Sequence, residues 1–135
     1  MSSEHNKKTV GEFFERFSAA DVIGALDLLA DSVIWRAMGR EGGLPMSGTM
    51  DKKDIGELIE NVKAAFPAGM KLTPTGWTAE GERVALEMES YAVKTSGTVY
   101  NNLYHFLLTV SEGKITAIRE YLDTLHVKQV FVDDQ

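Results

Sequence analysis

Acidic and hydroxyl side chains suited to proton transfer gather in one stretch of this sequence, residues 82–123. Glu120, Glu89 and Tyr104 lie there, within runs that alternate as β-strands do. A carboxyl group surrounded by apolar atoms has a raised pKa and can exchange protons near neutral pH. A tyrosine hydroxyl can stabilise a developing oxyanion by a hydrogen bond. These residue types predict general acid-base chemistry on a carbonyl compound, with Glu120 as the acid or base, Glu89 assisting it and Tyr104 binding the oxyanion.

Two turn-forming sequences, at residues 94–97 and 111–114, would join the three strands of this stretch into an antiparallel meander. Residues equidistant from a hairpin turn lie on one face of the sheet. The second turn therefore predicts Tyr104 opposite or nearly opposite Glu120, and the first brings Glu89 towards Tyr104. The polar face of the meander is then expected to carry Glu87, Glu89, Tyr91, Asn102, Tyr104, Phe106 and Glu120.

The strand register admits one alternative. Because successive side chains of a strand point to opposite faces, a slip of one residue would turn the whole set over. The residues on the functional face would then be His105, Arg119, Tyr121 and Asp123. Both registers remain open from the sequence alone.

Further pocket residues are expected from the earlier part of the chain. The β-branched and aromatic run at 32–38 predicts a strand that carries Trp35 and Arg36. Arg36 would bind an anionic group of a substrate or, as favoured here, neutralise Glu87 and Glu89. Aromatic side chains would line the cavity or form the core. The residues expected to contact a substrate are Arg36, Trp35, Glu87, Tyr91, Asn102, Phe106 and Phe17.

Composition argues against several classes of protein. The chain has 135 residues, a net charge of −6 and no basic run, which disfavours nucleic-acid binding. It has no cysteine, and its histidines lack the paired spacing of metal ligands, so no metal site is expected. No apolar run approaches the roughly 20 residues of a membrane span, and the start MSSEHNKK lacks the apolar core of a signal peptide. We expect a cytoplasmic protein without a membrane partner, and a small apolar molecule as its ligand.

The expected helices precede most of the strands. Residues 1–8 are polar and are expected to be frayed. Apolar residues recur every three or four positions in three later segments, and Asp21, Asp51 and Asp54 are placed to cap two of the resulting helices. The helices are expected at 9–17, 21–31 and 51–66.

The expected strands outside the meander lie at 32–38 and 70–79. A loop or short edge strand is expected at 39–48, between the first of these strands and the helix at 51–66. Pro74 and Gly76 interrupt the second of these runs, so an edge position or a bulge is predicted for it. A short helical turn or a strand-like tail is expected at 125–131. This order predicts one α+β domain over 1–135, in which three helices pack on one side of a curled antiparallel sheet and enclose a pocket.

The element order and the segment GKITAIREYLD at 113–123 resemble the SnoaL-like polyketide cyclase branch of the nuclear transport factor 2-like superfamily. Ketosteroid isomerase and limonene-1,2-epoxide hydrolase are similar members. The resemblance implies a cone-shaped sheet, a cystatin-like roll, wrapped around three helices from the N-terminal half. It also implies chemistry without a cofactor and a homodimer formed through the open sheet. The expected apolar dimer face comprises Leu86, Met88, Leu103 and Leu107.

Site residues carry over from these relatives only in part. The epoxide hydrolase positions match Glu87, Glu89 and Glu120, but the arginine that holds the acidic pair has become Glu87. Three carboxylates without a central cation repel one another unless protons are retained. The two ketosteroid isomerase carboxylates fall near Arg36 and at Tyr104 or His105, so neither is retained. Glu120 matches the acid on the last strand that serves the cyclases as a general base.

The sequence therefore predicts a cofactor-free isomerase or cyclase that uses acid-base proton transfer on a small apolar carbonyl compound. The alternative is a domain of the same fold that binds a small molecule or assembles with other chains without catalysis. Epoxide hydrolysis is the third candidate. The sequence does not identify the substrate.

Overall fold

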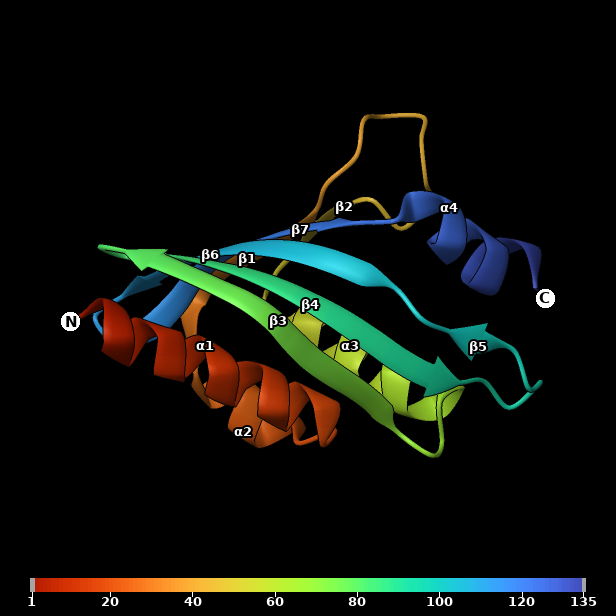
Figure 1. Ribbon diagram of the computed structural model, residues 1–135, viewed down its shortest axis with the longest axis horizontal. Coiled ribbons are helices and arrows are strands. Elements are labelled where there is room, and N and C mark those ends of the chain that lie inside the picture. The colour runs from red at the N-terminus through yellow and green to blue at the C-terminus, as the bar shows by residue number, and fades with distance from the viewer. Residues whose placement is uncertain (1, 135) are drawn as a thin grey trace.

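The computed structural model describes residues 2–134, whose elements are shown in Figure 1. The helices are α1 (Ser3–Ser18), α2 (Val22–Asp27), α3 (Lys52–Ala65), α4 (Thr124–Val127) and the π-helix η1 (Lys128–Asp133). The strands are β1 (Leu29–Ala37), β2 (Gly48–Met50), β3 (Met70–Glu80), β4 (Arg83–Val93), β5 (Val99–Tyr100), β6 (Leu103–Ser111) and β7 (Lys114–Leu122).

One curled sheet forms the scaffold of the protein. Its strand order is β2-β1-β7-β6-β4-β3, with β5 paired to β4. All neighbouring strands are antiparallel except β1 and β7, which run parallel, so the sheet is mixed where we predicted an antiparallel one. Helices α1 and α3 pack against its inner face (Figure 1), and the α+β fold expected from the sequence is confirmed.

Helix α1 begins earlier than its apolar pattern indicates. Ser2 is the N-cap, and its hydroxyl accepts a hydrogen bond of 3.1 Å from the backbone N–H of His5. This cap stabilises a first turn that we expected to be frayed. Residues 3–8 are therefore helical, and Asn6 is buried. Met1 lies outside the described residues.

The predicted caps of α2 and α3 are confirmed. The side chain of Asp21 accepts a hydrogen bond from Gly24, and Asp51 and Asp54 form a reciprocal capping box. Helix α2 ends at Asp27 instead of Asp31, because residues from Leu29 onward pair with β7. Tertiary pairing here overrides the helical pattern.

Strand β3 lies at the edge of the sheet, as its proline and glycine predict. Its register with β4 shifts between Pro74 and Gly76. An edge strand tolerates the missing N–H of a proline because one side of it needs no partner.

The first turn of the meander has three loop residues, and this odd number sets the register. Lys94 and Thr98 close the hairpin through a hydrogen bond of 2.8 Å from Lys94 N to Thr98 O. Met88 consequently pairs with Tyr104, and Glu89 pairs with Leu103. The expected register is wrong by one residue at this hairpin. Strand β4 presents its even-numbered side chains to the interior.

The second turn and a bulge keep Glu120 on the interior face. Glu112 and Gly113 both have positive φ, 52° and 79°, as in a type I′ turn. The register then shifts beside Thr109, leaving Thr116 as the extra residue of β7. Glu120 thereby pairs with Phe106, so it shares a face with Tyr104, as predicted, although Tyr104 itself lies opposite Leu122.

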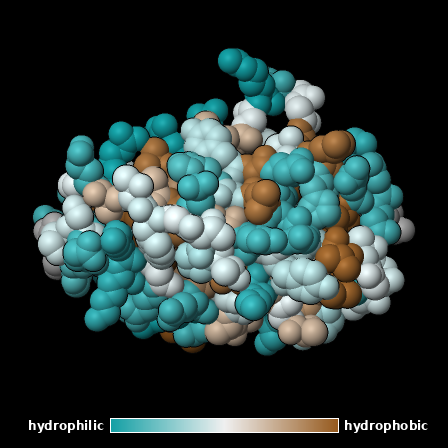
Figure 2. All heavy atoms as spheres, viewed as in Figure 1, coloured by the Kyte–Doolittle hydropathy of each residue, from teal (hydrophilic) through white to brown (hydrophobic). Residues whose placement is uncertain are grey.

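The C-terminal segment is helical, and it lies at the opposite end of the molecule from the N-terminus (Figure 1). Figure 2, seen from the same side as Figure 1, shows hydrophobic side chains as separate patches among hydrophilic ones. The loop that projects between β1 and β2 has a hydrophilic tip. Among the described residues, no helix combines the length and apolar character needed to cross a membrane.

Candidate functional site

A pocket of about 480 Å³ lies between the inner face of the sheet, α1, α3 and the C-terminal segment. Its walls are predominantly apolar. Phe14 and Phe17 come from α1, Trp35 from β1 and Phe106 from β6. Their rings touch one another, with Trp35 and Phe106 edge to face at a centroid distance of 5.9 Å. The volume suits an apolar ligand of several rings.

Five methionines also line this pocket, and they are Met38, Met46, Met50, Met70 and Met88. Methionine is unbranched and adapts its shape to its neighbours. This lining allows one pocket to fit ligands of differing outline.

Glu120 is the one carboxylate among the described residues that line the pocket, where no Lys, Arg or His side chain accompanies it. Its Oε1 accepts a hydrogen bond of 3.1 Å from Nε1 of Trp35. Burial among apolar side chains raises the pKa of Glu120 to about 7, although the indole N–H acts in the opposite direction. Both protonation states of Glu120 are therefore populated near neutral pH.

Two tyrosine hydroxyls provide the second polar group of the pocket. Oη of Tyr100 and Oη of Tyr104 are 2.6 Å apart, and both residues line the cavity. Burial raises the pKa of Tyr100 to about 12 and raises the pKa of Tyr104 as well. Both phenols therefore keep their protons and can act as hydrogen-bond donors.

Ser90 and Asn102 support the tyrosine pair from behind. Tyr104 Oη lies 3.2 Å from Ser90 Oγ, and Asn102 Nδ2 donates a hydrogen bond of 3.1 Å to Tyr100 Oη. Tyr104 donates its one proton to Ser90, so Tyr100 donates to Tyr104. Both tyrosines line the pocket, and a ligand oxygen would receive the proton of either one in place of one of these two bonds.

The structure brings only part of the predicted site together. Five of the expected residues line the pocket, and they are Glu120, Tyr104, Trp35, Phe106 and Phe17. Asn102 is buried, but its side chain is used by Tyr100 and by the backbone of Asp123. It holds the site in place and does not face a ligand.

Glu87, Glu89 and Tyr91 lie on the opposite face of the sheet, because the first turn has an odd number of residues. Glu89 Oε2 accepts a hydrogen bond of 2.8 Å from Asn101 Nδ2 there. Our placement of these three residues in the pocket was wrong.

Arg36 also lies outside the pocket. It is exposed on β1, and β7 and β6 separate β1 from β4. Three strand spacings place Arg36 roughly 14 Å from Glu87 and Glu89. The expected neutralisation of these glutamates by Arg36 therefore does not occur within one chain.

Tyr100 and Ser90 were missed by sequence reasoning. Tyr100 follows the same alternation as Asn102 and Tyr104, so this signal was available in the sequence. Ser90 belongs to the even-numbered face of β4, which only the correct register identifies.

One acidic group and a pair of hydroxyls in an apolar pocket form a candidate site for small-molecule binding or proton transfer. A family model described as SnoaL-like domain matches residues 10–118, and the chain belongs to this family. The family includes polyketide cyclases and related enzymes. No curated protein matches this sequence.

Solved structures of nuclear transport factor 2-like proteins share the fold. A protein of this kind from Burkholderia xenovorans LB400 is 26% identical, with a TM-score of 0.77 over 96% of this chain and 97% of its own. TerC, co-crystallised with polyporic acid, is 22% identical, with a TM-score of 0.78 over 93% of this chain and 96% of its own. A Jannaschia sp. CCS1 protein described as a SnoaL-like polyketide cyclase is 15% identical, with a TM-score of 0.77 over 94% and 91%.

Proposed function

We propose that this protein is a cofactor-free isomerase or cyclase acting on a small, uncharged, apolar carbonyl compound. One observation carries the proposal. Glu120, with a pKa raised to about 7, faces an otherwise apolar pocket whose inner wall also presents two tyrosine hydroxyls. A group with this pKa exchanges protons efficiently near neutral pH.

The proposed reaction begins with the ionised form of Glu120. Trp35 holds Oε1, so Oε2 is left to accept a proton from the carbon beside the substrate carbonyl. The C–H bond breaks, and its electron pair moves into an enolate whose oxygen accepts a hydrogen bond from Tyr100 or Tyr104. Glu120 then returns the proton to another atom, which isomerises the substrate, or the enolate carbon closes a ring on a second carbonyl of the same molecule, whose oxygen takes the proton.

The absence of a lining cation supports an uncharged ligand. Ionised Glu120 would repel an anionic ligand in a pocket whose described lining holds no positive side chain. TerC, of similar fold, was crystallised with polyporic acid, and this supports a ring compound as the ligand here.

A binding domain without catalysis is the second candidate. The pocket brings one carboxylate to the ligand where two or three were expected, and this observation favours it. Epoxide hydrolysis loses support, because Glu87 and Glu89 lie on the opposite face from Glu120 and the set of three carboxylates is not assembled.

The test is hydrogen exchange at carbon. Cyclic ketones such as 2-tetralone are incubated with the protein in deuterium oxide, and deuterium uptake beside the carbonyl is followed by mass spectrometry. We expect catalysed uptake that falls about a hundredfold or more in Glu120→Gln. Glu60→Gln, on the exposed side of α3, is the matched control and should keep the wild-type rate. Ketone binding without catalysed uptake would favour the binding domain.

We also propose that two copies pair through the outer face of the sheet. Leu86 and Met88, expected on that face, are buried inside. Leu103, Tyr91, Ile34 and Tyr121 are apolar residues on the outer face, with exposed fractions of 66%, 51%, 45% and 42%. Large apolar side chains grouped on one sheet face support association.

The charges of the outer face are self-complementary. Arg36 and Arg119 are neighbours on β1 and β7, while Glu87 and Glu89 lie on β4 at the other side of the face. A two-fold axis parallel to the strands would lay β1 of one copy over β4 of the other. Arg36 would then neutralise the glutamates between chains.

A further inference from the structure

The C-terminal segment, residues 124–134, supplies one wall of the pocket. Val127 and Phe131 line the cavity. The ring of Phe131 lies edge-on to the ring of Tyr100 at a centroid distance of 5.0 Å. The imidazole of His126 stacks on the ring of Tyr100 at 5.4 Å, with an angle of 2° between the two planes. The position of the Tyr100 hydroxyl therefore depends on this segment, which we name the C-terminal wall.

The C-terminal wall is attached differently from the other walls. Strands of the sheet and helices with long packed faces form most of the pocket, whereas residues 124–134 contribute no strand to it. Side chains take part in its attachments to the body. His126 Nε2 accepts a hydrogen bond of 3.0 Å from the backbone N–H of Asn101 near the start of the wall.

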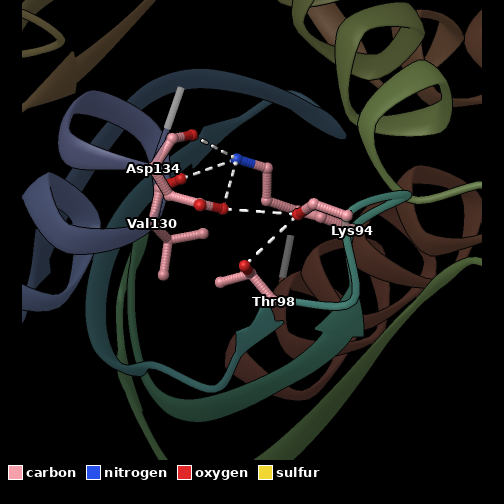
Figure 3. A network of polar contacts seen from close by, with 5 residues as sticks. Lys94, Thr98, Val130 and Asp134 are labelled. Atoms are coloured by element: carbon pink, nitrogen blue, oxygen red, sulfur yellow. Dashed lines mark hydrogen bonds and ion pairs between the residues drawn. The ribbon is translucent and has the colours of Figure 1, made fainter.

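Lys94 holds the far end of the wall. Its Nζ donates hydrogen bonds of 2.8 Å to Val130 O and 3.0 Å to Asp134 O, and it forms an ion pair of 3.2 Å with Asp134 Oδ2 (Figure 3). Ser96 adds a hydrogen bond of 3.3 Å to the same carboxylate oxygen. Both Lys94 and Ser96 belong to the turn that follows β4, about 40 residues earlier in the sequence.

The ammonium group of Lys94 makes three of the contacts that hold the far end of the wall. The last carbonyls of a helix lack partners within the helix, and a cation placed there satisfies them. Lys94 uses two of its donors on the carbonyls of Val130 and Asp134 and the third on the Asp134 carboxylate. Its Nζ also lies over the ring of Phe131, 5.9 Å from the ring centroid. Hydrogen bonds from Thr98 and Lys94 lower the pKa of Asp134, so the pair stays ionised at neutral pH.

We propose that residues 124–134 are a hinged wall latched by Lys94, and that a ligand enters and leaves the pocket when this latch opens. Asp123, the N-cap of α4, is the hinge, since the chain leaves β7 there. Lys94 is then a positioning residue for Tyr100 that acts from outside the pocket. This inference rests on the proposed function only in that the pocket takes up a ligand.

The first experiment needs no ligand. Lys94→Met keeps the apolar stem but removes the three donors, and Lys128→Met is the control, because Lys128 pairs with Asp133 within the wall. Hydrogen exchange measured by mass spectrometry should become about tenfold faster over residues 124–134 in Lys94→Met, with little change in the sheet. Unchanged exchange in this segment, or an equal acceleration in Lys128→Met, would overturn the latch.

The second experiment locks the wall. The chain contains no cysteine, so Ser96→Cys/Asp134→Cys creates one disulfide at positions whose side-chain oxygens are now 3.3 Å apart. The neutral fluorescent ketone Prodan serves as the ligand, and its association is followed by stopped flow. We expect association at least about tenfold slower in the oxidised form than in the reduced form. Equal rates would mean that the ligand enters elsewhere, for example beside the loop at 39–47, and would overturn the hinged wall. Loss of catalysis in the deuterium assay would leave both results unaffected.

Discussion

Nε1 of Trp35 donates a hydrogen bond to Oε1 of Glu120 across the parallel strands β1 and β7. This bond stabilises the ionised carboxylate against the cost of its apolar surroundings. It also fixes one carboxylate oxygen and leaves the other free to exchange a proton. The two residues therefore set together the pH at which Glu120 exchanges its proton.

Trp35→Phe should raise the pKa of Glu120 further, because it removes a donor that favours the charged form. We expect a rise of about one pH unit, which corresponds to roughly 1.4 kcal/mol. A carbon-detected NMR titration of the Glu120 carboxyl would measure it, and the acid limb of deuterium uptake should move to higher pH by the same amount. An unchanged or lower pKa would show that the indole does not stabilise the carboxylate.

Glu120 should make the protein less stable as pH rises. Its folded pKa of about 7 lies above the value of 4.5 for a free side chain, so the folded state binds the proton more tightly. This contribution is fully present below pH 4.5 and is lost as pH rises through about 7, at a cost of at most about 3 kcal/mol.

Glu120→Gln cannot ionise and should remove this loss. The free energy of unfolding of the variant minus that of the wild type, from urea denaturation, should be greater at pH 8.5 than at pH 5 by up to about 3 kcal/mol. Comparing the two proteins cancels the titration of all other groups. A difference that does not vary with pH would mean that Glu120 is solvated.

Local signals in the sequence predicted the helices well. Asp21, Asp51 and Asp54 make their caps through contacts between residues three apart, so no knowledge of the fold is needed to recognise them. Ser2 is an equally local cap, but no apolar stripe follows it immediately, so the sequence pattern alone predicts a frayed first turn of α1.

The register of the meander depended on details that the sequence leaves open. Residues 94–97 indicate a turn, yet whether Lys94 pairs with Gly97 or with Thr98 decides which face Glu89 occupies. No sequence signal indicates the bulge at Thr116. Without this bulge, the side chain of Glu120 would point to the face opposite to that of Tyr104. Glu120 and Tyr104 were therefore placed correctly by alternation, whereas Glu89 was not.

Asn102→Ala should destabilise the protein more than its single side chain suggests. Asn102 Oδ1 accepts from the backbone N–H groups of Leu103 and Asp123, and its Nδ2 donates to Tyr100 Oη. Leaving these buried groups without partners should cost about 2–4 kcal/mol in urea unfolding. Asn101→Ala, at an exposed neighbouring position, should cost less than about 1 kcal/mol. Equal losses in the two variants would contradict the supporting role of Asn102.

Dimer formation through the outer face should depend on opposite charges in two chains. We expect wild-type protein to sediment as a dimer at micromolar concentration, and Arg36→Glu to shift it towards monomer, because the new carboxylate would face Glu87 and Glu89 of the second copy. Within one chain these residues are separated by two strands, so the substitution should leave folding intact. The reversed pair Arg36→Glu/Glu87→Arg should recover the dimer at least in part. A wild-type monomer would refute the assembly, and a dimer unaffected by Arg36→Glu would place the interface on another surface.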